Sequence, residues 1–357
     1  MNYKALIAMS GGVDSSVAAA IMKDSGYDCT GVTMKLYGNS NLSVSTEHSC
    51  CTTDDIDDAR KVAEKLGIGH QVVDFSERFS ETVIDNFVNC YKNGITPNPC
   101  IECNRCLKFN YLFNKMEEIG ANYIVTGHYV RIVYDKDKDR YLLLKALDDT
   151  KDQSYVLYTL TQYQLKHIKF PLGEISKSNA RAIAEEYGFV NANKPDSQDI
   201  CFVKGESYAD FIRRYSGEES KPGNFVDING NVLGTHKGII NYTIGQRKGL
   251  GLSTGEKLFV VDINPVTNEI ILGSNDDLFN DTLFASKINW ISIDALNEPI
   301  KVKAKVRYKQ EAQPATVYNA GDDKIKVVFD KPQRAITKGQ SVVLYDGDIV
   351  VGGGTIL

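Results

Sequence analysis

The sequence predicts an α/β protein in three parts: a Rossmann-like parallel-sheet domain (1–205), a small central module (206–280) and a C-terminal β-barrel-like domain (281–357). The first part alternates short apolar runs with amphipathic helical segments, which is typical of a parallel sheet covered by helices. The stretch Gly217–Gly255 is rich in glycine and short apolar pairs. From about Asp281, short strands alternate with turn residues. A length of 357 residues also exceeds one ordinary domain.

The first part contains expected strands and helices in alternation. Apolar runs of strand length occur at Lys4–Met9, Asp28–Lys35, His70–Phe75 and Tyr123–Thr126. Apolar residues at helical spacing occur at Val13–Asp24, Thr53–Leu66, Phe79–Tyr91, Lys108–Glu118 and Lys177–Tyr187. A glycine ends three of these helices, at Gly26, Gly67 and Gly188.

The last part has the pattern of strands joined by tight turns. Strands are expected at Ile300–Tyr308, Ala315–Tyr318, Ile325–Phe329, Ser341–Tyr345 and Ile349–Thr355. Pairs of glycine and aspartate indicate hairpin turns at Gly321, Asp322, Asp346 and Gly347.

Basic side chains occupy every second position of the strand expected at Ile300–Tyr308. They are Lys301, Lys303, Lys305, Arg307 and, just beyond, Lys309. Alternate residues of a strand share one face, so the residues between them, ending with Tyr308, are expected in the core. An ordinary solvated face mixes charges. Five positive side chains therefore favour a surface that follows nucleic-acid phosphates, and Arg247 and Lys248 add a second positive point.

Composition limits the class of protein further. The net charge of −5 argues mildly against nucleic-acid binding, but affinity for phosphates depends on local patches. No apolar run is long enough to span a bilayer, and Ala5–Met9 is too short for a signal peptide, so we expect a cytoplasmic protein without a membrane partner. The eight cysteines are thinly spread except for one cluster, which in a reducing cytosol indicates catalysis or metal binding.

The most informative segment is Ala-Met-Ser-Gly-Gly-Val-Asp-Ser-Ser, from Ala8 to Ser16. It follows a strand and opens a helix. Two glycines let the backbone approach an anion, three serines add hydroxyl donors, and the helix start adds free N–H groups. It lacks the Gly-Lys-Ser/Thr ending of a Walker loop, so transfer of a γ-phosphate is not expected. A bare turn without a ligand would explain one Gly-Gly pair, but not this whole string.

This string resembles the pyrophosphate loop (PP-loop) of the ATP-pyrophosphatase superfamily, whose members adenylate a substrate oxygen. Two cysteine-bearing segments, Thr96–Phe109 and Asp196–Phe202, resemble those of bacterial tRNA-specific 2-thiouridylases. The segments Thr126–Tyr129, Lys151–Gln153 and Gly245–Leu250 match the same family in order and spacing. The resemblance implies ATP-dependent 2-thiolation of the wobble uridine. It also implies ATP with Mg²⁺, tRNA and not DNA as substrate, and a persulfide-bearing sulfur donor such as a cysteine desulfurase or relay protein.

The resemblance also implies roles for individual residues. Cys103 would be the nucleophile, Cys201 would carry a persulfide, and a disulfide between them would end the reaction. The expected ATP contacts are Ala8, Met9, Ser10, Gly11, Gly12, Val13, Asp14, Ser15, Met34 and Gly127. The expected contacts with the target base and the rest of the tRNA are Asn98, Pro99, Cys100, His128, Lys151, Asp152, Gln153, Arg307, Tyr308 and Gln340. Both reactive thiols would need a lowered pKa, for which Arg105 and Lys108 are candidates.

The chain departs from the family at Cys100, where some members carry an aspartate proposed for acid–base chemistry. Glu102 or Asp199 could substitute. Cys100, Cys103 and Cys201 could hold an iron–sulfur cluster, and Cys106 extends the series to a possible zinc site, but Cys100 and Cys106 could equally be plain loop residues. The remaining cysteines, Cys29, Cys50, Cys51 and Cys90, are expected to be packing residues.

Three other functions stay open. An adenylating synthetase for a small metabolite would need the phosphate loop but neither Cys103 nor Cys201. A tRNA thiolase dependent on an iron–sulfur cluster would use the same fold. A non-catalytic metal- or RNA-binding module would leave Ser10–Ser16 unexplained.

Overall fold

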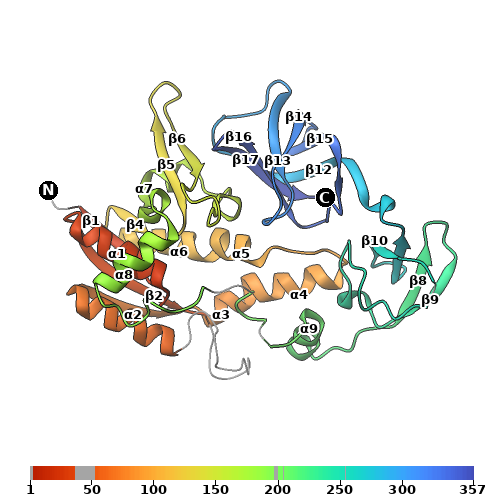
Figure 1. Cartoon of the computed structure of the whole chain (residues 1–357), viewed down its shortest axis with the longest axis horizontal. Helices are drawn as coiled ribbons and strands as arrows, with labels where there is room; N and C mark the ends of the chain where they lie inside the picture. The colour runs from red at the N-terminus through yellow and green to blue at the C-terminus, as the bar shows by residue number, and fades with distance from the viewer. Residues whose placement is uncertain (1–2, 37–52, 197–199, 204, 254) are drawn as a thin grey trace.

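The computed structural model describes residues 3–36, 53–196, 200–203, 205–253 and 255–357. Three parts follow one another along the chain, with the parallel sheet at one end, a smaller sheet at the other and a barrel above the middle (Figure 1). The predicted α/β class with a C-terminal barrel is confirmed. The predictions for Cys50, Cys51 and Asp199 lie outside the described residues.

The N-terminal domain is built on a five-stranded parallel sheet in the order β3-β2-β1-β4-β7. Its strands are β1 (Lys4–Ala8), β2 (Asp28–Lys35), β3 (Gly69–Asp74), β4 (Tyr123–Val125) and β7 (Ile168–Lys169). Ile7 of β1 lies opposite both Gly31 of β2 and Val125 of β4. The strand order reverses around β1, and the crevice at the carboxyl edge of such a switch point is where open α/β sheets bind ligands.

Helices cover both faces of this sheet because successive residues of β1 point to opposite sides. Ala5 and Ile7 share a core with α1, α2 and α8, whereas Leu6 belongs to a second core with α4 and α6. The α-helices of the chain are α1 (Val13–Asp24), α2 (Thr53–Leu66), α3 (Ser76–Phe79), α4 (Asp85–Lys92), α5 (Pro99–Glu102), α6 (Phe109–Glu118), α7 (Gln162–His167), α8 (Lys177–Glu186) and α9 (Tyr208–Ser216).

Two long helices each pass through a π-helical segment. Residues Ser80–Ile84 join α3 to α4, and Cys103–Lys108 join α5 to α6. The helix predicted at Lys108–Glu118 therefore begins nine residues earlier, at Pro99. The Asn98 side chain accepts a hydrogen bond from the backbone N–H of Ile101 at 3.3 Å, and proline is favoured in the first turn. Cys100 and Cys106 are thus helical, and the prediction that they are loop residues is wrong.

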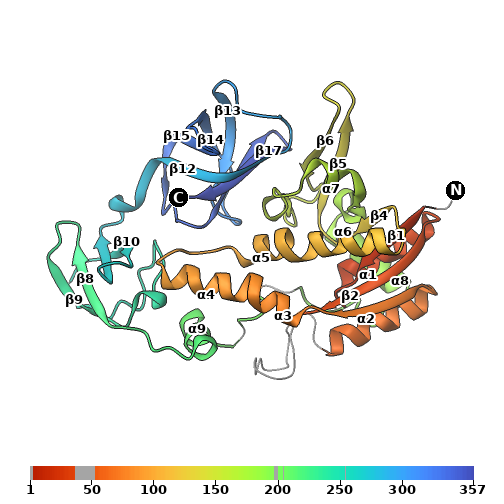
Figure 2. The ribbon, with the colours of Figure 1, turned by 180° about the vertical axis from the view of Figure 1, so that it is seen from behind.

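The two helices run side by side across the middle of the molecule, between the parallel sheet and the central module (Figures 1 and 2). The central module follows α9 and contains a four-stranded sheet in the order β10-β11-β8-β9. Its strands are β8 (Gly223–Asp227), β9 (Val232–His236), β10 (Phe259–Asn264) and β11 (Glu269–Gly273).

The C-terminal strands form a closed barrel in the order β12-β15-β14-β13-β16-β17, with β12 also paired to β17. They are β12 (Phe279–Trp290), β13 (Ile300–Lys305), β14 (Gln313–Asn319), β15 (Lys324–Arg334), β16 (Ser341–Asp346) and β17 (Ile349–Ile356). A hairpin from the N-terminal domain, β5 (Val130–Asp135) and β6 (Arg140–Lys145), extends this sheet through Leu144 opposite Ile349. The first and last parts of the chain therefore share one sheet.

The predicted strand Ile300–Tyr308 ends early, at Lys305. Beyond it the chain bends, and the Arg307 guanidinium donates to the carbonyl oxygen of Ala335 at 2.9 Å. Tyr308, expected in the core, is 39% exposed as a result. The five basic residues therefore do not form one continuous strand face.

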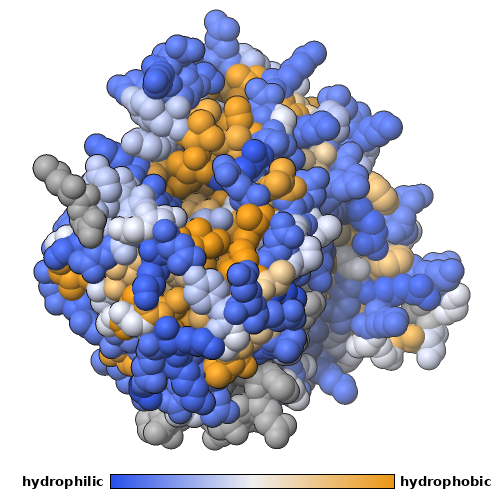
Figure 3. Space-filling view, turned by 60° about the vertical axis from the view of Figure 1, so that its left-hand side comes forward, coloured by the Kyte–Doolittle hydropathy of each residue, from blue (hydrophilic) through white to orange (hydrophobic). Residues whose placement is uncertain are grey.

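The face of the molecule with the N-terminal domain forward is mostly hydrophilic, with apolar side chains in a band up its middle (Figure 3). Exposed apolar residues of this domain include Val133, Leu147 and Val190. Folded proteins always leave part of their apolar surface exposed, so this band alone indicates no partner.

Candidate functional site

The loop between β1 and α1 brings two glycines to the carboxyl edge of the sheet. Gly11 has a φ of 73°, in the left-handed region that glycine adopts without strain. A Cβ at Gly11 would lie 2.2 Å from the backbone oxygen of Asp55, so only glycine fits. Gly12 precedes α1 with extended backbone and contributes no capping side chain. The first turn of α1 can therefore offer its N–H groups to an anion.

The serine hydroxyls mostly stabilise the loop itself. Ser15 and Ser16 donate to the carbonyl oxygen of Gly12 at 3.0 and 3.1 Å. Ser15 Oγ also accepts from the backbone N–H of Ser10 at 3.1 Å. Two of the three hydroxyls that were expected to donate to an anion are thus used within the loop. Ser10 is exposed, and its Oγ lies 3.3 Å from Ser15 Oγ.

A buried asparagine that no motif indicated holds the loop from outside. Asn191 is 2% exposed, and its Nδ2 donates to the carbonyl oxygen of Gly11 at 3.0 Å and to Ser16 Oγ at 2.9 Å. Lys194 pairs with Asp55 and Asp58 of α2, at 2.7 Å each. The segment after α8 therefore locks the loop against α2, a contact that local sequence patterns do not reveal.

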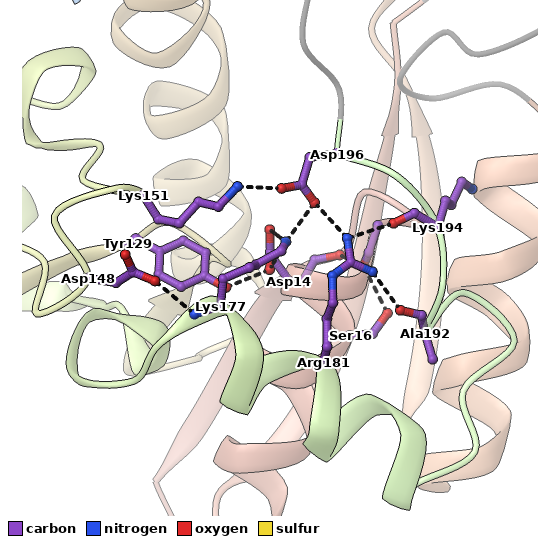
Figure 4. A network of polar contacts seen from close by, with 12 residues as sticks. Asp14, Ser16, Tyr129, Asp148, Lys151, Lys177, Arg181, Ala192, Lys194 and Asp196 are labelled. Carbon is purple, nitrogen blue, oxygen red and sulfur yellow. Dashed lines mark hydrogen bonds and ion pairs between the residues drawn. The ribbon is translucent and has the colours of Figure 1, made fainter. Parts of the chain in front are cut away.

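Charged side chains beside the loop form a chain of ion pairs (Figure 4). Lys177 Nζ lies 2.8 Å from both carboxylate oxygens of Asp14 and 2.7 Å from Oδ1 of Asp196. Asp196 also contacts Lys151 at 2.9 Å and Arg181 at 3.4 Å. Burial opposes ionisation of Asp196, but hydrogen bonds from Lys177 and Lys151 keep the pKa of its carboxyl below the usual value. Sequence reasoning missed Lys177 and Arg181, which lie on an otherwise ordinary amphipathic helix.

The residues expected near the adenosine lie around the same edge. Met9 and Val13 are core residues, 2% and 3% exposed, so they shape the loop. Met34 is the penultimate residue of β2 and is 8% exposed. A Cβ on Gly127 would lie 2.7 Å from the backbone nitrogen of Ser15. Glycine at this position therefore lets the end of β4 approach α1.

His128 follows β4 and is enclosed by aromatic rings. Its ring centroid lies 6.4 Å from Phe109 and 6.1 Å from Phe170, and its Nδ1 is 2.7 Å from Thr126 Oγ1. Although part of the residue remains accessible, burial, reinforced by the nearby charge of Lys108, lowers the pKa of His128 to about 3. His128 is therefore neutral at physiological pH and cannot form an ion pair with a phosphate.

The two cysteines with expected catalytic roles contact the same hydrophobic core. Cys103 is 7% exposed and begins the π-helical segment, a geometry that occurs frequently at functional sites. Cys201 is half-buried and packs against the core that contains Cys103. Its neighbour Phe202 is 1% exposed, with its ring centroid 5.2 Å from that of Phe87.

The helical stretch Pro99–Lys108, which carries Cys100, Cys103 and Cys106, is called the cysteine helix below. Charges around it are already paired with one another. Arg105 forms an ion pair with Glu102 at 2.6 Å, and Glu102 also accepts from Cys106 Sγ at 3.6 Å. Burial raises the pKa of the Cys106 thiol, with Arg105 opposing and Glu102 reinforcing the effect. Glu102, a candidate to replace the aspartate that some family members carry at position 100, is thus paired with Arg105. Burial also raises the pKa of Cys29, to about 11, as expected of a packing residue.

The expected metal ligands do not assemble. Across the described ranges, no group of three or more histidine, cysteine, aspartate or glutamate side chains is arranged to hold a metal ion. The helix exposes Cys100 and buries Cys103. Neither the iron–sulfur set with Cys201 nor the zinc set with Cys106 is thus grouped as metal ligands in the described part of the chain.

Residues expected to contact tRNA at Lys151–Gln153 also bind within the chain. Lys151 pairs with Asp196, and the Asp152 carboxylate accepts from Ser154 Oγ at 2.8 Å. Gln153 Oε1 accepts from the backbone N–H of Tyr129 at 2.9 Å. These contacts hold the turn after β6 against β4.

Two further expected tRNA contacts join distant parts of the chain. Arg307 donates to Ala335 as described and to Thr337 Oγ1 at 2.8 Å. Gln340 Nε2 donates to the carbonyl oxygens of Thr96 and Pro97 at 2.9 and 3.1 Å. Gln340 of the barrel is therefore hydrogen-bonded to the backbone immediately before the cysteine helix.

Tyr308 is the exposed ring of this group. Lys305 Nζ lies 5.6 Å from its ring centroid, and its hydroxyl donates to the backbone oxygen of Asp152 at 3.2 Å. Burial raises the pKa of Tyr308, and the charges of Asp152 and Cys100 add to this effect, which places Cys100 near the ring. Of the remaining basic residues, Lys301, Lys303 and Lys309 are exposed. No helix in the described part of the chain combines the length and apolar character needed to cross a bilayer.

Comparisons with known proteins agree with this architecture. Residues 3–205 match the family model described as a tRNA methyl transferase HUP domain, 209–274 the corresponding PRC-barrel domain, and 280–356 an aminomethyltransferase β-barrel domain. Among solved structures, NMN synthetase from Francisella tularensis gives a TM-score of only 0.35 at 15% identity, over 62% of this chain and 79% of that chain, too weak to support an argument.

Curated relatives match the whole chain. The tRNA-specific 2-thiouridylase MnmA of Clostridioides difficile is 54% identical over 356 residues, 100% of this chain and 98% of that protein. The protein of the same name from Clostridium acetobutylicum is 51% identical and covers 100% of both chains. The chain therefore belongs to the tRNA-specific 2-thiouridylase family.

Proposed function

We propose that this enzyme replaces the C2 oxygen of the wobble uridine in tRNA with sulfur, at the expense of ATP. The observation that carries the proposal is a phosphate loop at the carboxyl edge of the sheet, combined with two cysteines, Cys103 and Cys201, that contact one core. The curated relatives are named for this activity. A synthetase that joins an amine to an adenylate needs the loop but neither thiol.

Adenylation is the first step. The uridine C2 oxygen attacks the α-phosphorus of ATP, the bond to the β-phosphate breaks, and pyrophosphate leaves. N–H groups at the start of α1 would stabilise the charge on the phosphates. The residues that we assign to the ATP site, with the buried Met9 and Val13 shaping the loop, are Ala8, Met9, Ser10, Gly11, Gly12, Val13, Asp14, Ser15, Met34 and Gly127. Mg²⁺ would neutralise phosphate charge, and because both Asp14 carboxylate oxygens are paired with Lys177, its oxygen ligands would come from the phosphates and water.

Sulfur transfer follows. The terminal sulfur of a Cys201 persulfide attacks C2 and expels AMP. The Cys103 thiolate then attacks the inner sulfur on Cys201, the sulfur–sulfur bond breaks, and its electron pair stays on the sulfur of 2-thiouridine. The Cys103–Cys201 disulfide left behind takes two electrons from a thiol reductant. A persulfide-bearing protein, such as a cysteine desulfurase or relay protein, supplies the next sulfur.

The uridine must leave its stack for C2 to meet both ATP and a thiolate. Asn98, Pro99 and Cys100 would line the base pocket, with Tyr308 as an aromatic surface beside Cys100. Neutral His128 would act through a hydrogen bond or packing only. The other residues assigned to tRNA binding are Lys151, Asp152, Gln153, Arg307 and Gln340.

Single cysteine variants test the proposal. We expect Cys103→Ser and Cys201→Ser each to lower ATP-dependent thiolation of tRNA by about 10³-fold or more, because serine can neither carry a persulfide nor resolve one. Cys106→Ser, on the same helix, is the matched control and should stay within about threefold of wild type, because its raised pKa makes the thiolate scarce.

Anaerobically purified protein is assayed together with metal and sulfide analysis. If the wild type does not thiolate tRNA, and Cys103→Ser and Cys201→Ser keep its full ATP turnover, the result would point instead to an adenylating synthetase. Bound iron and sulfide that are required for thiolation would replace the persulfide route with a cluster-dependent one.

A further inference from the structure

We infer that Asp196 is a positioning residue that ties the segment carrying Cys201 to the phosphate loop, and that sulfur transfer needs it whereas adenylation does not. This role rests on the proposed function, because it takes Cys201 as the sulfur carrier. Asp196 itself is assigned no contact with ATP, tRNA or the reacting atoms.

Three cationic groups hold the Asp196 carboxylate (Figure 4). Lys177 and Arg181 reach it from successive turns of α8, at 2.7 and 3.4 Å, and Lys151 reaches it from the turn after β6, at 2.9 Å. The Asp196 side chain is 25% exposed. Contacts from two separate elements fix a carboxylate in direction as well as in place, which one surface ion pair does not.

Lys177 connects this carboxylate to the nucleotide site. It is 9% exposed, and its ammonium lies between Asp196 and Asp14 of the phosphate loop. The backbone N–H of Lys177 donates to Asp148 at 3.0 Å, and Tyr129 donates to Asp14 at 2.8 Å. Both ends of the bridge are therefore fixed, and the position of Asp196 is set relative to the loop.

Cys201 follows Asp196 by five residues. A chain of that length spans at most about 18 Å, so the fixed carboxylate limits where the sulfur can lie. On its other side, Phe202 is anchored by the rings of Phe79 and Phe87, at 5.8 and 5.2 Å between centroids. Cys201 therefore lies next to an aromatic anchor at Phe202 and within reach of an ionic one at Asp196, and Asp196 contacts Lys177, the partner of Asp14 in the phosphate loop.

Asp196→Asn removes the charge but keeps the size of the side chain. Lys177 keeps its pairing with Asp14, so the loop retains its shape and adenylation should stay within about threefold of wild type. The Cys201 segment loses its ionic anchor, and displacement of a reacting group by about 1 Å costs on the order of 100-fold in rate. We therefore expect sulfur transfer to fall by about 100-fold.

The experiment is a single-turnover reaction of full-length enzyme, ATP, unmodified tRNA and a persulfide donor, in which pyrophosphate and 2-thiouridine are both followed in time. Asp262→Asn is the control, because it removes another lysine–carboxylate pair, with Lys338 at 3.1 Å, that is exposed and belongs to the central module and barrel. The control should leave both rates unchanged. If Asp196→Asn does not fold, Asp196→Glu is used, with transfer expected to fall by about tenfold at unchanged pyrophosphate release.

A selective loss of sulfur transfer supports the inference. Equal losses of pyrophosphate release and thiolation, or normal rates of both, overturn it and leave the proposed function intact. If Cys201→Ser thiolates tRNA normally in the same assay, the proposed function fails as well. The two failures are therefore distinguishable.

Discussion

Two side-chain amides, the buried Asn191 and the half-buried Gln340, each hold a backbone segment of the site. Asn191 donates to Gly11 and Ser16 of the phosphate loop, 180 and 175 residues away in sequence. Gln340 donates to Thr96 and Pro97 just before the cysteine helix, 244 and 243 residues away. The hydrogen bonds of Asn191 stay within the N-terminal domain, whereas those of Gln340 join the barrel to the N-terminal domain.

The difference shows how independent each half is. The phosphate loop needs only the parallel-sheet domain, because its glycines, hydroxyls and buttress all belong to that domain. The start of the cysteine helix depends on Gln340, in the turn just before barrel strand β16 near the other end of the chain. ATP binding should therefore tolerate damage to the barrel better than thiolation of tRNA does.

The largest expected effect is at Gly11. Gly11→Ala should lower the free energy of unfolding by about 3 kcal/mol or more and abolish ATP binding, because the new Cβ meets the backbone of Asp55 in a left-handed conformation. Gly120→Ala is the control, since Gly120 has a φ of 63° with nothing within 4 Å of a Cβ. It should lose only about 1 kcal/mol and keep ATP binding in calorimetry. Equal losses would show that the contact with Asp55 is unimportant.

The two amides give a reciprocal test of intermediate size. Asn191→Ala should cost about 1–3 kcal/mol and raise the KM for ATP, because it removes two buried hydrogen bonds from the loop. Gln340→Ala should cost a similar amount in stability, leave ATP binding unchanged and slow thiolation of tRNA. Urea denaturation measures the loss of stability. ATP affinity and the rate of 2-thiouridine formation are measured separately for each variant. If Asn191→Ala and Gln340→Ala weaken ATP binding equally, the proposed difference between the two halves of the site is wrong.

The smallest effect concerns His128, which packs between Phe109 at the end of the cysteine helix and Phe170. Its pKa is about 3 in the folded protein and about 6.5 when unfolded, so its stabilising contribution is complete above pH 6.5 and falls as the pH is lowered. Between pH 7.5 and 5.5, wild type should lose about 1.4 kcal/mol more than His128→Asn in urea unfolding. Identical pH dependence in both proteins would contradict the burial of a neutral imidazole.

Local sequence predicted the elements whose signals are contiguous. The strand–glycine–helix pattern around Gly11 predicted β1, the loop and α1 within a residue, because each step depends on neighbours in the chain. The same holds for α2 and α8 and for the barrel strands β16 and β17. The other barrel strands were predicted less well: β13 ends three residues early, β14 and β15 run longer than predicted, and β12 was not predicted. Local sequence failed at Pro99–Lys108, where a helical stretch rich in polar residues and cysteines shows little amphipathic pattern.

The sequence alone determined the fold class, the phosphate loop and the family to which the cysteine segments belong, because these depend on residue type and short spacing. Only the tertiary structure decided which polar groups meet. Asn191 beneath Gly11, Lys177 between Asp14 and Asp196, and Gln340 on Thr96 are contacts between distant residues, and each depends on packed elements that bring them together. Hydrogen bonds and ion pairs are specific at about 3 Å, whereas spacing in a sequence constrains position only within one element.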